Sequence, residues 1–132
     1  MTGRSLIQTV SYDKQAMEQV SSRVVVIESY KAQYDDPIVL RAGENVDVQR
    51  GDPDFPEWFW CRGPDGKEGW VHFSYLSQTT GQATAVSDYS ARELTVVAGD
   101  EARLIRTLGG WSYLALDDGR FGWVPDKIIQ AK

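Results

Sequence analysis

The chain contains the same block of sequence twice, and this internal repeat constrains its fold more than any other feature. The block that begins at Trp58 aligns without a gap with the block that begins at Trp111, at an offset of 53 residues. Both blocks carry an Asp-Gly pair and then Gly-Trp-Val at matching positions. Self-similarity of this length indicates one structural unit that is used twice.

The repeat continues upstream, where residues 38–44 align with residues 94–100 at an offset of 56. The change of offset places three extra residues of the first copy in the stretch 51–57, which corresponds to 107–110 in the second copy. Both stretches contain Pro or Gly, which mark loops, and loops tolerate insertions. The two copies are therefore expected to share a fold and to differ in the length of one loop.

Each copy has the pattern of short strands joined by tight turns. Val46 and Val48 alternate with polar neighbours, as a half-buried strand requires. The Asp-Gly pairs at 65–66 and 118–119 predict hairpin turns, because both central residues of such a turn need a positive φ. Short strands with frequent turns predict a small barrel or sandwich, so the expected fold class is all-β with two five-stranded barrels.

The repeat also sets the expected domain bounds. We expect one barrel at residues 24–78 and a second at 83–131, with a linker of five residues at 78–82. Such a short linker holds the two barrels close together. Residues 1–23 match neither copy, and this extension is expected to be either a short amphipathic helix or disordered.

The second copy resembles Src-homology-3 (SH3) domains. Residues 85–89 are similar to the Ala-Leu-Tyr-Asp-Tyr opening of that family, and Glu93-Leu94 with Gly99-Asp100 resembles its diverging turn. Trp111 matches the first Trp of the family's Trp-Trp pair, although Ser112 replaces the second. The stretch 122–125 is similar to the family's Gly-Tyr/Trp-Val/Ile-Pro sequence. The resemblance implies a small β-barrel that binds partners.

The first copy resembles a bacterial variant of the same domain. The resemblance is carried by residues 30–34, by an acidic loop that ends at Trp58, and by residues 69–76. A barrel of this type hosts many different partners, so the resemblance specifies the fold more closely than the function. It implies a non-enzymatic binding module.

The family's binding groove is formed by aromatic residues and a proline, which bind a peptide in the polyproline II conformation. Trp58 and Trp111 each follow a loop, and we expect both to be exposed for binding. Trp70 and Trp123 each lie between Gly and Val, and we expect these two to be framework residues of the barrels. The opening tyrosine of the first copy is either Tyr30 or Tyr34. The groove positions that the resemblance implies are Trp58, His72 and Tyr75 in the first copy and Tyr89, Trp111, Pro125 and Ile128 in the second.

Because Ser87 and Ile128 stand where the family has tyrosines, we expect the first copy to bind more strongly. Its loops add further candidate ligand-binding residues, namely Tyr34, Asp35, Asp36, Asp54 and Phe55. Acidic side chains beside a groove favour cationic partners, so the expected partner is a protein or peptide that is basic or rich in proline.

Composition argues against several other classes of function. The net charge is −5 and the pI is about 4.8, which disfavours binding to nucleic acid or to anionic lipid. Cys61 is the one cysteine and His72 the one histidine of the sequence, so we expect no catalytic site, metal site or cofactor. No apolar run approaches the length of a membrane span, and no signal-peptide pattern is seen, so the expected location is cytoplasmic.

The sequence leaves three hypotheses for function. The first is an adaptor that binds a peptide or protein surface as a monomer or weak dimer. The second is a bacterial-type SH3 module that recognises cell-wall peptides. The third is a structural module in which the aromatic side chains are used between two packed barrels or in a dimer.

Overall fold

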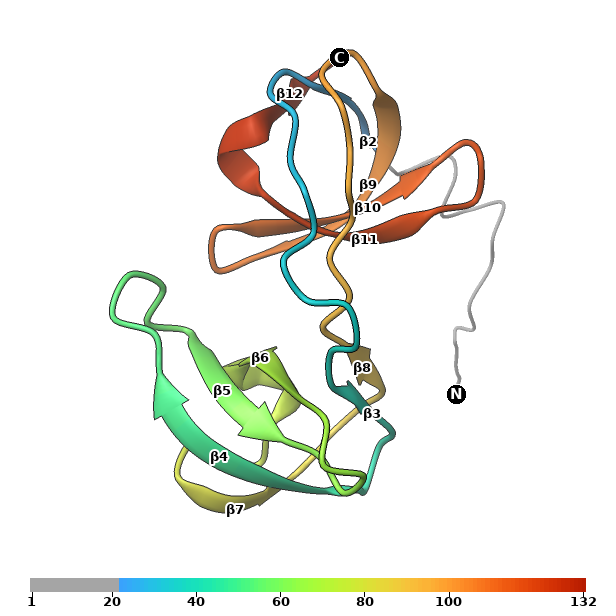
Figure 1. Ribbon diagram of the computed structural model, residues 1–132. Helices are drawn as coiled ribbons and strands as arrows, with labels where there is room; N and C mark the ends of the chain where they lie inside the picture. The colour runs from blue at the N-terminus through green and yellow to red at the C-terminus, as the bar shows by residue number, and fades with distance from the viewer. Residues whose placement is uncertain (1–21) are drawn as a thin grey trace, which may run out of the picture.

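The computed structural model describes residues 22–132, and these residues form two small β-rich units that lie one above the other in Figure 1. Within residues 22–132, all regular elements are strands apart from two single turns of 3₁₀ helix. The expected all-β fold class is therefore confirmed. The expectation of a helix or disorder for residues 1–23 concerns residues outside the described part of the chain, except that Ser22 and Arg23 begin strand β2.

The unit drawn at the bottom of Figure 1 consists of residues 38–91, and we call it the inserted unit. Its strands form a four-stranded sheet in the order β6-β5-β4-β7 and a two-stranded sheet of β3 and β8. In chain order its elements are β3 (Val39–Leu40), β4 (Asn45–Gly51), β5 (Trp58–Arg62), β6 (Glu68–His72), η1 (Phe73–Tyr75), β7 (Gly81–Thr84) and β8 (Tyr89–Ser90).

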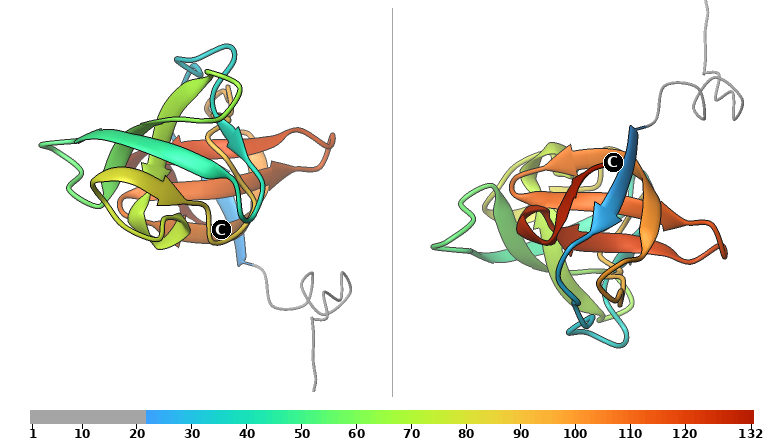
Figure 2. Two further views of the ribbon diagram at one scale, coloured as in Figure 1. Left: turned by 90° about the horizontal axis from the view of Figure 1, so that it is seen from below. Right: turned by 90° about the horizontal axis from the view of Figure 1, so that it is seen from above.

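The second unit is assembled from both ends of the described chain, residues 22–34 and 92–132, and we call it the split unit. Its five strands form one sheet in the order β11-β10-β9-β2-β12, and both views of Figure 2 show β2, in blue, beside the orange and red strands of this unit. Its elements are β2 (Ser22–Val26), β9 (Glu101–Leu108), β10 (Trp111–Leu116), β11 (Phe121–Pro125), η2 (Asp126–Ile128) and β12 (Ile129–Ala131).

The hydrogen-bonded units do not follow the bounds 24–78 and 83–131 that the repeat suggests. Strand β2, which opens the first copy, pairs with β9 and β12 of the second copy. Strand β7, which opens the second copy, pairs with β4 of the first. The two copies thus exchange their opening strands. As a result, the inserted unit interrupts the chain of the split unit.

The short linker gives a physical reason for this exchange. Five residues span at most about 17 Å when fully extended, which limits how far the chain can travel before β7 begins. In the structure the linker instead turns back at once: Leu76 bridges to Ala85, and the Ser77 N–H donates to the Thr84 carbonyl. Gly81 has a φ of +63° at this turn, a conformation that glycine adopts without strain.

Two antiparallel segments connect the units, and Figure 1 shows them side by side in cyan and orange-yellow. In the split unit, Tyr30 and Val96 exchange both backbone hydrogen bonds across these segments. In the inserted unit, the Ala91 N–H donates to the Ile38 carbonyl. The two opening segments therefore pair with each other's copies at these positions, while the Ile38 N–H also donates to the Glu68 carbonyl of its own copy.

Each unit has its own apolar core. The core of the split unit includes Val24 and Val26 of β2, together with Leu114 of β10 and Val124 of β11. The core of the inserted unit is built from residues 38–91, but it also contains Trp123 of β11. The Trp123 side chain therefore joins the two units through apolar packing.

Residues 22–132 were compared with two simple structural requirements, those of a membrane-spanning helix and of a metal-binding cluster, and meet neither. No helix in this range is long and apolar enough to cross a membrane. No group of three or more His, Cys, Asp or Glu side chains in the same range is arranged to hold a metal ion.

Candidate functional site

The two tryptophans that follow the loops of unequal length each contact the loop of the other copy. Trp58 begins β5, and its indole N–H donates to the carbonyl of Gly109, at 2.9 Å, in the loop 107–110. Trp111 begins β10, and its ring lies edge-on to Phe55 of the loop 51–57, with ring centroids 6.1 Å apart. The loops therefore cross between the units in a reciprocal arrangement.

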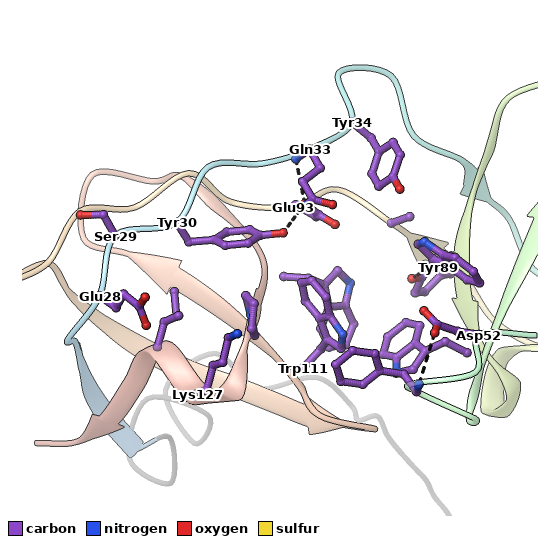
Figure 3. Close-up of a pocket in the computed structure, with 17 residues that line it drawn as sticks. Glu28, Ser29, Tyr30, Gln33, Tyr34, Asp52, Tyr89, Glu93, Trp111 and Lys127 are labelled. Carbon is purple, nitrogen blue, oxygen red and sulfur yellow. Dashed lines mark hydrogen bonds between the residues drawn. The ribbon is translucent and has the colours of Figure 1, made fainter.

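A groove of about 430 Å³ lies beside these contacts and is shared by both units. We call it the composite groove, and Figure 3 shows its lining side chains. The inserted unit contributes Asp52, Phe55, Trp58, Trp70, Tyr89 and Ala91. The connecting segments and the split unit contribute Glu28, Ser29, Tyr30, Gln33, Tyr34, Glu93, Trp111, Trp123, Pro125, Lys127 and Ile128.

Tyr30 and Trp111 form the aromatic wall of the groove on the side of the split unit. Their rings meet edge to face, with centroids 6.1 Å apart. The Tyr30 hydroxyl donates to Glu93 Oε1 at 2.8 Å, and the Gln33 backbone N–H donates to the same oxygen at 2.9 Å (Figure 3). Burial, and then the hydrogen bond to Glu93, raise the pKa of Tyr30, so its hydroxyl remains protonated at physiological pH.

The two loop-following tryptophans differ in accessibility. Trp58 is only 5% exposed, and Gly109 accepts its indole N–H. Trp111 is half-buried, and within residues 22–132 no backbone or side-chain group accepts its indole N–H. An indole N–H is a donor that usually finds a partner when it is buried. Trp111 therefore lines the groove with a half-buried ring whose N–H donor is unused within residues 22–132.

The charged side chains that line the composite groove are mostly acidic. Glu28, Asp52 and Glu93 face one lysine, Lys127. Asp52 also organises the loop 51–57, because its Oδ1 accepts the backbone N–H of Asp54 at 2.9 Å. A groove with this balance of charge favours a cationic ligand over an anionic one.

The structure brings together some of the site residues expected from the sequence and separates others. The composite groove is lined by Tyr34, Phe55, Trp58, Tyr89, Trp111, Pro125 and Ile128. The expected residues that are absent from its lining are Asp35, Asp36, Asp54, His72 and Tyr75.

The residues outside the lining have other contacts or are exposed. Asp36 forms an ion pair with Lys67, with an N···O distance of 3.0 Å, while Asp35 and Asp54 are exposed in loops. His72 is buried at the start of η1, where its Nε2–H donates to Glu57 Oε1 at 2.7 Å and its Nδ1 accepts from the Ser74 N–H.

Tyr75 is buried against Tyr89, with ring centroids 4.5 Å apart. The pairing joins one aromatic residue from each copy, because Tyr89 lies in β8 of the exchanged opening segment. The Tyr89 hydroxyl donates to the Trp70 carbonyl at 2.6 Å, and burial raises its pKa well above the usual value. Both rings are buried in the inserted unit, at the place where Arg106 of the split unit reaches the Tyr75 hydroxyl.

Three expectations about the tryptophans have different outcomes. Trp123 is 4% exposed, so its framework role is confirmed. The exposure expected for Trp58 is wrong, because the loop 107–110 covers it. Trp70 is half-buried against the core of the inserted unit, as expected for a framework residue, and it also lines the groove.

The sequence did not identify several residues of the groove, for two different reasons. Glu28, Ser29 and Gln33 precede the first copy's β3, and the repeat assigned them to the wrong unit. Both candidates for the opening tyrosine, Tyr30 and Tyr34, line the groove, and Tyr30 contacts Trp111. Glu93 and Lys127 carried no signal, since isolated charged residues are common on protein surfaces.

Comparison with known families supports the first copy directly. Residues 23–78 match the family model of the variant SH3 domain, which supports an SH3-type domain in this part of the chain. Domains of this type are generally non-catalytic modules of protein interaction. The second copy is not part of this match, and its likeness rests on the internal repeat. Comparison with curated proteins gives no match.

Proposed function

We propose that this chain is a non-enzymatic adaptor that binds an extended peptide segment of a partner protein in the composite groove. The proposal refines the general role of an SH3-type domain in protein interaction. The groove volume of about 430 Å³ is within the usual range for a ligand site. One chain supplies every residue of its lining, so a monomer is sufficient for binding.

The observation that carries the proposal is the state of Trp111. Its half-buried ring stands between Tyr30 and Phe55, and its indole N–H has no acceptor within residues 22–132. An extended peptide has backbone carbonyls that are not paired within the peptide, and one of them can accept this N–H. A polyproline II segment suits the site because it is already extended and loses little entropy on docking.

The charges around the groove favour a ligand that carries Arg or Lys. Glu28 and Asp52 line the groove from the two units and lie toward its opposite ends in Figure 3, so each can attract a cationic side chain of the ligand. Such exposed charges are screened by salt over about 10 Å at 0.1 M. Binding is therefore expected to weaken as the ionic strength rises.

The test is selection of peptides from a displayed library of 12-residue sequences enriched in Pro and Arg, followed by calorimetric titration of a selected peptide. Trp111→Phe keeps a ring and removes the N–H donor, so the affinity should fall by about threefold to tenfold, the value of one net hydrogen bond. Trp60→Phe is the matched control, because its N–H already donates to Glu68 and Trp60 does not line the groove.

Two outcomes would contradict the proposal. The first is a selection that yields no peptide with binding above background. The second is a selected peptide that binds Trp111→Phe as tightly as wild type. Either result would favour the structural hypothesis, in which the aromatic side chains serve only to hold the two units together.

A further inference from the structure

The turn between β9 and β10, residues 107–110, lies against the surface of the inserted unit that surrounds Trp58. The Gly109 carbonyl accepts the Trp58 indole N–H at 2.9 Å, and Leu108 packs against the core of the inserted unit. This turn therefore supplies to Trp58 the kind of carbonyl acceptor that Trp111 lacks.

A cationic side chain accompanies the carbonyl. The Arg106 guanidinium donates a hydrogen bond to the Tyr75 hydroxyl and lies 5.8 Å from the centre of the Tyr75 ring. Arginine stacks on aromatic faces and donates to nearby oxygens, which is how an arginine-containing peptide would engage the same tyrosine. One short segment of the split unit thus brings a carbonyl, an apolar side chain and a cation to the inserted unit.

The fit at this contact depends on glycine. A Cβ atom at Gly109 would lie 2.5 Å from Trp58 Nε1 and 3.2 Å from His72 Cδ2. A Cβ atom at Gly110 would lie 2.8 Å from the Phe55 ring. Both glycines also have positive φ, a conformation that is strained for other residues. The turn therefore needs glycine both for its backbone conformation and for its close approach to the inserted unit.

We propose that the β9–β10 turn is an internal ligand of the inserted unit. It occupies the surface formed by Trp58 and Tyr75, and its withdrawal exposes a second site for an arginine-containing peptide. The proposal rests on the proposed function only in the class of its ligand, since the second site does not include Trp111. The closed chain offers one peptide site, in the composite groove, and the opened chain offers two.

Withdrawal of the turn does not require the split unit to unfold. Strands β9 and β10 pair with each other along their length, and the Asp126 N–H donates to the Gly110 carbonyl within the same unit. The inserted unit likewise keeps its own sheet of four strands. Opening therefore breaks contacts between the units, including the packing of Trp123 on Trp58, and leaves the strand pairing of both sheets in place.

The first test uses Gly109→Ala, which forces the turn away from Trp58. The matched control is Gly119→Ala, because Gly119 also has a positive φ in a hairpin of the split unit, but a Cβ there meets nothing within 4 Å. Hydrogen exchange of the Trp58 indole N–H, followed by NMR, should accelerate at least about tenfold in Gly109→Ala, since the N–H loses its acceptor and its cover. Gly119→Ala should leave this rate unchanged.

The second test asks whether the exposed surface binds peptides. Arginine-containing peptides are selected from the displayed library on the Gly109→Ala variant. Some should bind this variant at least about tenfold more tightly than wild type. Their binding should fall when Trp58→Phe is added to Gly109→Ala, and it should be insensitive to Trp111→Phe. A peptide that is sensitive to Trp111→Phe reports on the composite groove, so the two sites are read separately.

If Gly109→Ala does not fold, Arg106→Gln replaces it in both tests, with Arg120→Gln as the control. Arg106→Gln removes the cation from Tyr75 and should raise Trp58 N–H exchange severalfold, whereas Arg120 contacts Asp118 and the Thr95 carbonyl, and not Tyr75. Unchanged protection of Trp58 in the opened variant would overturn the proposal. So would an exposed Trp58 that selects no peptide dependent on its N–H.

Discussion

The inserted unit and the split unit place the same residue after the same loop and use it differently. Trp58 and Trp111 occupy equivalent positions in the repeat, yet Trp58 is buried with its N–H bonded, and Trp111 is half-buried with its N–H unused. The difference follows from the loops that cross between the units. The short glycine turn 107–110 fits closely on Trp58, whereas the longer loop 51–57 places only the edge of Phe55 on Trp111.

The comparison shows that the binding capacity of a repeated unit depends on what its neighbour places against it. Judged by its side chains, the first copy has the better groove, since the second has Ser87 and Ile128 in place of aromatic residues. In the structure, the groove of the first copy is covered, and Tyr30 of the first copy supplies a ring beside Trp111. We therefore propose that the split unit contributes most to binding, the reverse of the ranking expected from sequence.

The largest expected effect concerns Trp123, which belongs to the split unit but packs in the core of the inserted unit. Trp123→Ala should lower the free energy of unfolding by about 3–5 kcal/mol, the usual cost of removing a large buried aromatic side chain. Trp70→Ala, at the equivalent repeat position, should cost clearly less, because Trp70 is half-buried. Chemical denaturation of both variants measures the two free energies of unfolding. Equal losses of stability in the two variants would contradict the proposed role of Trp123 in joining the units.

A smaller effect is expected where the two copies differ at the start of their 3₁₀ turns. His72 caps η1 with its side chain, while Pro125 at the equivalent position makes no such bond. His72→Ala leaves the Ser74 N–H and Glu57 without this partner and should cost about 1–3 kcal/mol. Pro125→Ala is the control in the same assay and should have the smaller effect; the opposite order would show that the cap does not stabilise the inserted unit.

The repeat predicted the strands, the hairpins and the small barrel-like units because these depend on local patterns within each copy. The Asp-Gly pairs do lie at turns, between β5 and β6 and between β10 and β11. The alternating residues Val46 and Val48 do point into a core. Patterns of this kind specify which face of a strand is buried.

The exchange of opening strands could not be predicted from the same patterns. Strand β2 and strand β7 are equivalent in the repeat, so either can complete either unit with similar hydrogen bonds. The linker and the contacts between the units determine which unit each strand completes. In one such contact, the Trp123 indole N–H donates to the Ser90 carbonyl at 3.0 Å. These contacts join residues that are distant in the sequence, and the composite groove follows from them.

The smallest effect compares equivalent core positions, Cys61 in the inserted unit and Leu114 in the split unit, both fully buried. Burial raises the pKa of the Cys61 thiol to about 12, so almost no thiolate is present at pH 8. Cys61 should therefore react with a thiol reagent at least about a hundredfold more slowly in the folded protein than in denaturant. Leu114→Cys in a Cys61→Ala background should be protected to a similar extent, because Trp123 couples the two cores. Rapid labelling at one position alone would show that the units open independently.

The exchange of opening strands is the central claim, and engineered cysteine pairs test it most directly in a Cys61→Ala background. Arg23 lies opposite Arg103 and Asp47 lies opposite Gln82, whereas a chain in which each copy kept its own opening strand would place Arg23 opposite Asp47. Directly opposed residues of antiparallel strands are close enough for a disulfide. Mild oxidation and mass spectrometry of the monomer should show intrachain disulfides in Arg23→Cys/Arg103→Cys and in Asp47→Cys/Gln82→Cys, and none in Arg23→Cys/Asp47→Cys. A disulfide in the last pair, with none in the first two, would contradict the account.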